Sequence, residues 1–411
     1  MLSHSNSPRK ISRLSEVTEA IREMANSAGA GAKLPTIVEL RRDLGASIST
    51  LSGALQELES SGVIYRRHSI GIFVSPSFNT RKIRVLLDAR VVRAPGVSPF
   101  WGTLWGLLAD EAKNRSGQFK EECIFQVVES LLHSDLELAH NLLSEYRVGR
   151  LHGILCVGLQ ENLYPLLKNE IAPIVGFGGH FQWFVETDGA RGLRMAVNEL
   201  AKQGCVNVGL WHHVPSFVPP LPGNTEREVK MFRQALSSAK LAFQPHLLKE
   251  RAIVENGVVV ESGQEQGYQL ALEVFGASLK NRVSNATSST RSSANIAAAT
   301  GAATSTTTAA TKGAAIPDGL VITHDLMTDG ALLALQELNM KAGRDVKIAT
   351  FGNQGSVILF RRASQITIIE YNTLQIARSM FDMLETLMSG QTPPRRERWI
   401  SPQLHPTKST S

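Results

Sequence analysis

Cysteine and long apolar runs are scarce in this sequence, and each scarcity excludes a class of protein. The three cysteines, Cys123, Cys156 and Cys205, are odd in number and lack metal-ligand spacing, as suits a reducing compartment. No run of about 18 apolar residues exists to span a membrane, and the N-terminal MLSHSNSPRK lacks the apolar core of a signal peptide. We therefore expect a soluble, cytoplasmic protein without a membrane partner.

Catalytic motifs are missing as well. The chain contains no P-loop, G-x-S-x-G, H-E-x-x-H or C-x-x-C motif. The pair His212-His213 has no further ligand at metal-binding spacing, and the glycine-rich run at 176–179 lacks the spacing of a nucleotide-binding loop. We expect no metal, no cofactor and no enzymatic activity.

Positive charge is concentrated at the N-terminal end. The whole chain has a net charge of +6, and residues 1–82 carry 11 Lys and Arg against 7 Asp and Glu, a net charge of +4. This excess favours an anionic partner for the first segment.

The first 75 residues follow the pattern of a winged helix. Apolar residues at helical spacing predict a helix over 11–27, a second after Leu34-Pro35 with Thr36 as its cap, and a third from Ser47 to Gly62. The sequence VIYRRHSIGIFVS then places two β-prone arms around a polar turn, which predicts a hairpin.

From residue 82 onward, strands and helices alternate. This alternation predicts an α/β architecture with parallel sheets, and the number of strands favours two lobes over one very wide sheet. Strands are expected at IRVLLD, CIFQVV, GILCVG, APIVGF, VNVGLW, GLVIT, DVKIATF and ITIIEY, and helices near 99–113, 189–203, 225–240, 262–276, 327–338 and 373–388.

One segment, 277–316, interrupts this alternation. It contains 27 Ala, Ser or Thr among 40 residues and no acidic residue. Such a composition buries too little apolar surface to offset chain entropy. We expect a disordered insertion before the strand at 319.

A helix-turn-helix places the N-terminal half of its second helix in the major groove. Polar residues on the helix that begins at Ser47 are placed for base edges and phosphate, and basic residues on the preceding helix and on the hairpin for phosphate or minor-groove contacts. Taken singly, such residues are more often ordinary solvated surface. The predicted DNA-binding residues are Arg41, Arg42, Ser47, Ser49, Thr50, Ser52, Gln56, Arg66, Arg67 and His68.

The segment LPTIVELRRDLGASISTLSGALQELESSGVIYRRHSIGIFV resembles the GntR-type winged helix. The scaffold positions of that family are matched, but its Glu-Arg pair becomes Ile37-Val38 and its two recognition-helix arginines become Ile48 and Ser52. These departures predict weaker DNA binding, a different operator, or more reliance on the remaining arginines. The matched positions are Leu34, Pro35, Glu39, Leu40, Leu44, Gly45, Ser47, Thr50, Ala54, Leu55, Leu58, Gly62, Gly71, Phe73 and Val74.

Residues 83–404 resemble the LacI/GalR-type ligand-binding domain, whose fold is that of periplasmic sugar-binding proteins. The resemblance rests on VETDGARGLRMAVNELAKQGCVNVGLW, on DGLVITHDLMTDGALLALQELNMKAGRDVKIATFGN and on ITIIEYNTLQIARSMFDMLETL. The family's Arg in R-x-x-G-F-x-x-A-L falls on Glu228, one place from Arg227, and its G-F-D becomes TFG at 350–352. These departures predict a ligand other than a typical hexose or pentose.

The resemblance implies a small polar effector, a sugar or sugar derivative, clamped between two lobes. Lobe closure would alter the spacing of two DNA-binding modules in a homodimer. Phe100 and Trp101 equally fit core packing, Asp188 a structural role, and Asp325 a helix N-cap. The predicted ligand-binding residues are Asp88, Phe100, Trp101, Asp188, Arg227, Asp325 and Asn353.

The sequence therefore predicts a DNA-binding transcription regulator, a repressor, with a winged helix over 1–80 and a two-lobed, type I periplasmic-binding-protein-like sensor over 82–404. A GntR-type reader on a LacI-type sensor is the layout of arabinose-repressor-like regulators. The alternatives are a sensor whose reader has lost DNA binding and an α/β enzyme with a regulatory appendage. The sequence names neither the effector nor the operator, nor whether the ligand induces or corepresses.

Overall fold

The computed structural model of the chain describes residues 12–89, 91, 98–129, 132–159, 172–178, 181–214, 224–255, 258–276, 316–359 and 362–407. The predicted insertion at 277–316 lies outside the described residues except for Ile316. The chain divides into two compact units: unit 1 comprises 1–88, 109–183 and 380–394, and unit 2 comprises 89–108, 184–379 and 395–411. Among the described residues, no helix has the length and apolarity needed to cross a membrane.

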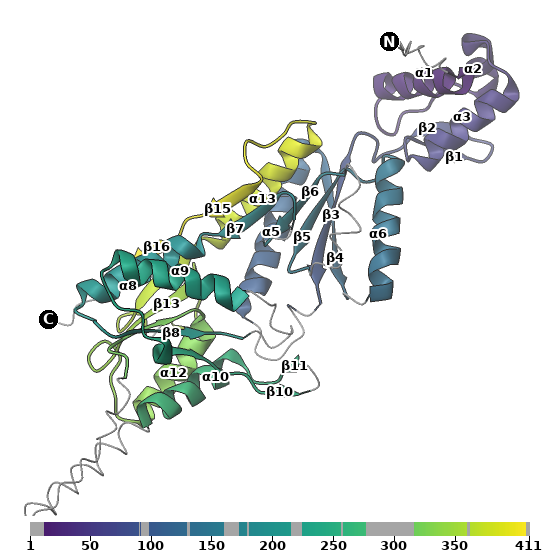
Figure 1. The fold of residues 1–411 in the computed structure, drawn as a ribbon. Coiled ribbons are helices and arrows are strands. Elements are labelled where there is room, and N and C mark those ends of the chain that lie inside the picture. The colour runs from purple at the N-terminus through teal and green to yellow at the C-terminus, as the bar shows by residue number, and fades with distance from the viewer. Residues whose placement is uncertain are drawn as a thin grey trace, which may run out of the picture. The chain divides into compact units, whose positions relative to one another are not determined.

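Three helices and a hairpin form the N-terminal part of unit 1 (Figure 1). They are α1 (Arg13–Ala28), α2 (Ile37–Leu44), α3 (Ile48–Ser60), β1 (Ile64–Arg67) and β2 (Gly71–Val74). The apolar positions that predicted the helices form one closed core, in which Ile21, Leu40, Leu51 and Leu58 are fully buried. The hairpin pairs Ile64 with Val74 in antiparallel register, so the predicted winged-helix outline is confirmed.

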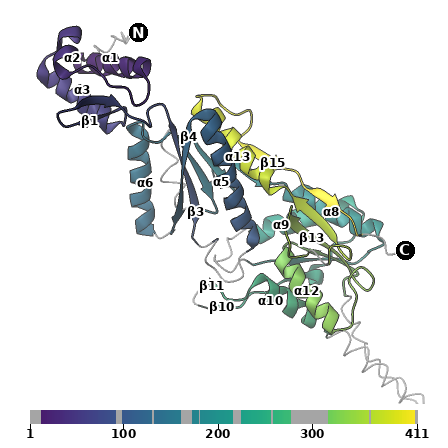
Figure 2. The same cartoon turned by 180° about the vertical axis from the view of Figure 1, so that it is seen from behind.

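Four parallel strands lie at the centre of the rest of unit 1. They are β3 (Arg81–Asp88), β4 (Glu121–Val128), β5 (Gly153–Val157) and β6 (Ile174–Phe177), side by side in the order β6-β5-β3-β4. Helices α5 (Pro99–Phe119) and α6 (Leu132–Arg147) lie on opposite sides of these strands (Figure 2). Strand β5 is buried at every position, as expected for a parallel strand covered on both faces.

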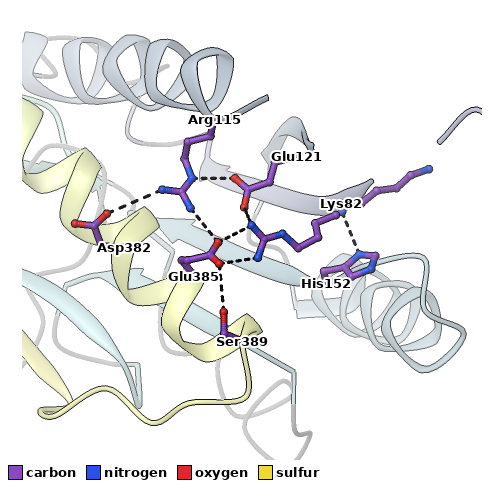
Figure 3. Close-up of polar contacts among 8 residues, drawn as sticks. Lys82, Arg115, Glu121, His152, Asp382, Glu385 and Ser389 are labelled. Atoms are coloured by element: carbon purple, nitrogen blue, oxygen red, sulfur yellow. Dashed lines mark hydrogen bonds and ion pairs between the residues drawn. The ribbon is translucent and has the colours of Figure 1, made fainter. Parts of the chain in front are cut away.

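A group of charged side chains is buried where β3, β4, α5 and α13 (Thr373–Met388) meet (Figure 3). The fully buried Glu121 carboxylate accepts a hydrogen bond from Arg115 Nε at 2.8 Å and lies 2.8 Å from Arg81 Nη2. Glu385 on α13 accepts from Arg81 at 2.7 Å and from Arg115 at 3.1 Å. Although burial opposes it, the hydrogen bond from Arg81 lowers the pKa of Glu385. Two arginines thus balance two carboxylates, and of these four groups Glu121 and Arg115 are buried whereas Arg81 and Glu385 are partly exposed.

The main sheet of unit 2 has the strand order β16-β14-β13-β12-β8-β9. Its neighbouring strands are parallel except for β16, which runs antiparallel to β14. The bounds are β8 (Val208–His212), β9 (Leu248–Glu250), β12 (Gly319–Ile322), β13 (Lys347–Asn353), β14 (Thr367–Tyr371) and β16 (Gln403–His405).

Helices cover both faces of this sheet. Successive side chains of a strand point to opposite faces, so neighbouring residues of one strand pack in different cores. Leu210 and Val321 pack in one core with α8 (Gly189–Lys202) and α9 (Asn224–Ser238). Their chain neighbours Trp211 and Leu320 pack in the other core with α10 (Gly263–Ala271) and α12 (Asp325–Glu337). Unit 2 is therefore a three-layer α/β/α structure.

The remaining elements are short and were not predicted. Strand β15 pairs in parallel with β7, and a π-helical turn extends α10. The predicted α/β class with parallel sheets is confirmed by the strand pairing, whereas the limits 1–80 and 82–404 stay predictions. The bounds are β7 (Phe184–Thr187), η1 (Pro245–Leu247), β10 (Val254–Glu255), β11 (Val258–Val259), η2 (Leu272–Gly276) and β15 (Glu397–Ile400).

Candidate nucleic-acid interface and effector site

Helix α2 is held at both ends. At its start, the Thr36 hydroxyl accepts a hydrogen bond from Glu39 N at 3.3 Å, and the Glu39 carboxylate accepts from Thr36 N at 2.7 Å. These two reciprocal bonds form a capping box. The hydrogen bonds that the Glu39 carboxylate accepts from the Thr36 backbone N and from the Thr36 hydroxyl lower the pKa of Glu39. Gly45, with a φ of 56°, ends the helix in the left-handed conformation that glycine adopts without strain. The tight turn to α3 follows directly.

Helix α3 presents a polar face opposite its buried one. The core side of α3 consists of Leu51, Ala54, Leu55 and Leu58, all buried. Four of the predicted DNA-binding residues are exposed: Ser47, Ser49, Ser52 and Gln56. The Ser47 hydroxyl accepts from Thr50 N at 3.1 Å, and the Thr50 hydroxyl lies 2.8 Å from it. Ser47 and the half-buried Thr50 therefore serve the helix start, and the exposed Ser49 joins them with its hydroxyl 2.9 Å from that of Ser47. Ser52 and Gln56 are exposed on the same helix.

Several basic side chains of the predicted interface already have partners. Arg42 Nε lies 2.9 Å from Asp43, and Arg66 donates its Nε to Glu59 at 2.9 Å. The hydrogen bond from Arg66 lowers the pKa of Glu59. Sequence spacing gave no indication of the Arg66–Glu59 pair, because Glu59 approaches the hairpin only after α3 and β1 pack together.

Two arginines remain better placed for phosphate. Arg41 is exposed and makes no ion pair with any residue that the structure describes. On the hairpin, the Arg67 guanidinium lies 5.6 Å from the ring of Tyr65 and 5.9 Å from that of Phe73, which stack on each other. His68 is exposed at the turn. The rings hold Arg67 in place without neutralising its charge.

The predicted effector residues of unit 2 lie at the carboxyl edge of its sheet and on nearby helices. Asp325, 3% exposed, is the first residue of α12, and its carboxylate accepts from Leu326 N at 2.9 Å and from Ser356 Oγ at 3.2 Å. Asn353 ends β13 and is half-buried. Asp188 caps α8 by accepting from Arg191 N at 2.9 Å, and Arg227 is exposed on α9.

The other predicted residues are distributed over both units. Asp88 ends β3 in unit 1 and is fully buried. Phe100 and Trp101, in unit 2, are half-buried at the start of α5, with their ring centroids 5.1 Å apart in an edge-to-face arrangement. All seven assignments stay predictions.

A stacked pair of histidines at the same edge of the unit 2 sheet was not predicted as part of the site. His213 follows β8 and His324 follows β12, two neighbouring parallel strands, and the ring centroids lie 4.2 Å apart. Burial lowers the pKa of His213 to about 2 and also lowers that of His324. Both imidazoles are therefore neutral near pH 7. Sequence reasoning missed the pair because two strands 111 residues apart in the chain, β8 and β12, bring it together.

His324 Nδ1 lacks a hydrogen-bond partner among the described residues. It is buried, and Asp325 Oδ1 lies 3.5 Å away. A buried polar atom without a partner is costly. The neighbouring His212 differs: despite opposing burial, its hydrogen bond with Glu228 raises its pKa. No group of three or more potential metal ligands occurs in the described part of the chain.

Family models match both ends of the chain. Residues 14–74 match the bacterial regulatory proteins of the gntR family, and residues 260–410 match the periplasmic binding protein-like domain. None of the curated protein sequences matches this one.

Solved structures share the fold. The transcription regulator CcpA of Lactococcus lactis is 17% identical with a TM-score of 0.54, over 81% of this chain and 100% of that one. A LacI-family regulatory protein from Chloroflexus aggregans is 14% identical with a TM-score of 0.56, over 79% and 98%. The transcriptional regulator CelR in complex with cellobiose is 14% identical with a TM-score of 0.51, over 97% and 98%.

The winged-helix fold of the first domain, together with its match to the gntR family, identifies a DNA-binding transcription regulator. The chain joins a gntR-type DNA-binding domain to a periplasmic-binding-protein-like sensor whose structural neighbours are LacI-type regulators. The predicted combination of the two domain types is confirmed.

Proposed function

We propose that the chain is a repressor that binds a double-stranded operator through α3 and the β1–β2 hairpin, under the control of a sugar-like effector. The observation that carries the DNA-binding part is the exposed face of α3 in a domain that matches the gntR family. In such domains the second helix of the helix-turn-helix enters the major groove. Ser49, Ser52 and Gln56 would then meet base edges, with Arg41 and Arg67 on the phosphates.

The effector proposal rests on the carboxyl edge of the unit 2 sheet. In open α/β sheets, ligands bind outside the carboxyl ends of the strands. There the neutral His213–His324 pair offers ring faces and nitrogen atoms, and Asp325 and Asn353 offer polar groups. Hydroxyl groups on an apolar ring suit such a set, and a hydroxyl would satisfy His324 Nδ1. The cellobiose complex of CelR supports a sugar-like ligand. That a second lobe covers the ligand stays a prediction.

A second candidate function is a sensor whose reader no longer binds DNA tightly. The pairing of Arg42 with Asp43 and of Arg66 with Glu59 favours it, because cations neutralised within the protein contribute less to phosphate binding. Under this second candidate function, the protein still binds the effector but does not bind an operator.

DNA binding separates the two candidates. We would measure fluorescence anisotropy of a labelled duplex from the upstream region of the gene at low salt, with the full chain and its variants. The repressor predicts saturable binding that Arg41→Ala combined with Arg67→Ala weakens, with a salt slope shallower by about 2 units if each arginine contacts a phosphate. Arg344→Ala, an exposed arginine of unit 2, is the matched control and leaves binding unchanged. Absence of binding at low salt would favour the sensor alone.

Effector binding is tested independently of DNA. A thermal-shift screen of sugars and sugar phosphates on the full chain detects any ligand that binds only the folded state. A ligand at about 100 times its Kd adds about 2.7 kcal/mol of stability. His324→Asn should weaken the shift, whereas His246→Asn, away from this edge on η1, should retain it. If no sugar shifts the wild-type transition, the effector belongs to another chemical class.

A further inference from the structure

Helix α3 carries no basic residue. Its 13 residues read ISTLSGALQELES, with two glutamates and no Lys, Arg or His. Ile48, Ser52 and Gln56 are exposed and follow one another at intervals of four residues, so they form one row, with Ser49 beside Ile48. Glu57 and Ser60 are also exposed but lie outside this row. This row is charge-neutral. Its first member, Ile48, is 58% exposed although it is a large apolar side chain.

The base pairs differ in what they offer such a row. Guanine presents two acceptors to the major groove and is most often bound by Arg or Lys. Thymine alone presents a methyl group there, and adenine presents the acceptor and donor that a Gln amide matches. A branched aliphatic side chain followed by an amide therefore complements A·T pairs and gives guanine no charged donor.

We propose that Ile48 determines operator specificity by packing against a thymine methyl group, with Gln56 toward adenine, so that α3 reads A·T pairs. The inference rests on the proposed DNA-binding function and adds to it the class of base that is read. Contact with the methyl group removes the exposed apolar surface of Ile48 from water, which is the physical driving force. Phosphate contacts are left to Arg41 and Arg67, outside α3.

The experiment removes the methyl group and nothing else. Duplexes are first selected from a random library with the full chain, and the best binder is then remade with deoxyuridine in place of each thymidine in turn. We expect thymine at a fixed position of the selected sequence, where uracil weakens wild-type binding about fourfold, the change that follows from exposing one methyl-sized group. Ile48→Ala should bind the thymine and uracil duplexes equally.

A matched variant on the same helix controls for general damage. Gln56→Ala changes an exposed residue two turns away and should keep the full uracil penalty while losing preference at a different base pair. Ile48→Arg should shift the selected base from thymine to guanine. Equal binding of uracil and thymine duplexes by the wild type, or an undiminished uracil penalty in Ile48→Ala, overturns the proposal while leaving DNA binding intact. Failure of the wild type to enrich any duplex overturns the proposed function itself.

Discussion

Glu121 and Arg115 are the most deeply buried charged pair described in unit 1, with side chains 0% and 6% exposed. Removing one partner leaves the other charge buried without compensation, which typically costs about 3–5 kcal/mol. We therefore predict that Glu121→Gln lowers the free energy of unfolding by about 3 kcal/mol, measured by urea denaturation. Arg344→Ala breaks a solvated pair with Asp345 and should leave the urea midpoint unchanged. A midpoint that is equally unchanged in Glu121→Gln would contradict this account.

The histidine stack makes stability depend on pH. An unfolded His213 binds a proton near pH 6.5, whereas burial holds the folded pKa at about 2. The stabilising contribution of neutral His213 is therefore complete above pH 6.5 and is lost as pH falls from 6.5 toward 2. His324 has the same direction, and His212, whose pKa is raised, has the opposite one.

Urea unfolding between pH 8 and pH 5, followed by tryptophan fluorescence, to which the buried Trp211 contributes, measures this dependence. We predict that wild-type stability falls below pH 6.5 by up to about 1.4 kcal/mol per pH unit for each histidine. His213→Gln should have a flatter profile. A profile of the same slope in His213→Gln would show that other groups dominate the pH dependence.

At the scale of single residues, the sequence predicted which side chains are candidates for DNA and effector binding, but not which other side chains they contact. Arg66 and Arg42 were expected at DNA, and the structure engages them with Glu59 and Asp43. Local spacing cannot reveal the Arg66–Glu59 pair, because that pair depends on how α3 packs against the hairpin. The same limit hid His324, because nothing local places it against His213.

Among the elements, long periodic segments were the easiest to predict. The apolar spacing of α1, α2 and α3 and the caps Thr36 and Ser47 lie in contiguous sequence, so their prediction needed no tertiary contact. The two- to four-residue strands β7, β9, β10, β11 and β15 are too short to show a period of two and are fixed by their partners.

The start of α3 offers a test at the element scale. Ser47 satisfies the Thr50 amide, and replacing a cap of this type by Ala costs about 1 kcal/mol. We predict that Ser47→Ala speeds amide hydrogen exchange in the first turn of α3 about fivefold in the full chain. Ser52→Ala, on the exposed face of the same helix, should leave that exchange unchanged. Equal effects of the two substitutions would deny the cap its role.

For the whole molecule, the alternation of strands and helices from residue 82 onward predicted the parallel sheets. The order of three helices and a hairpin in the first 75 residues predicted the winged helix, because it follows from local hydrophobic pattern. The alternation did not predict which strands share a sheet. The unit 2 sheet joins segments from 208 to 405, and its order β13-β12-β8 follows from tertiary packing alone.

Self-association is a prediction at this largest scale. A repressor with one small reader per chain gains affinity by presenting two of them to half-sites about 34 Å apart. We predict a dimer of the full chain by analytical ultracentrifugation and two copies per selected duplex. A monomer that binds a single half-site would require the reader to act alone.

Residues 75–80 connect the hairpin to β3, and hydrogen bonds and packing hold both ends of this connection. Ser75 N donates to Val63 O on the reader side, and Phe78 packs against the winged-helix core. Immediately afterwards, Arg81 N donates to Lys120 O and its guanidinium enters the charge cluster with Glu121 and Glu385. From a short connection that is held at both ends, we predict that movements of β3 are transmitted to the winged helix. Lengthening residues 75–80 with several glycines should let DNA and effector bind independently, so that neither changes the affinity for the other.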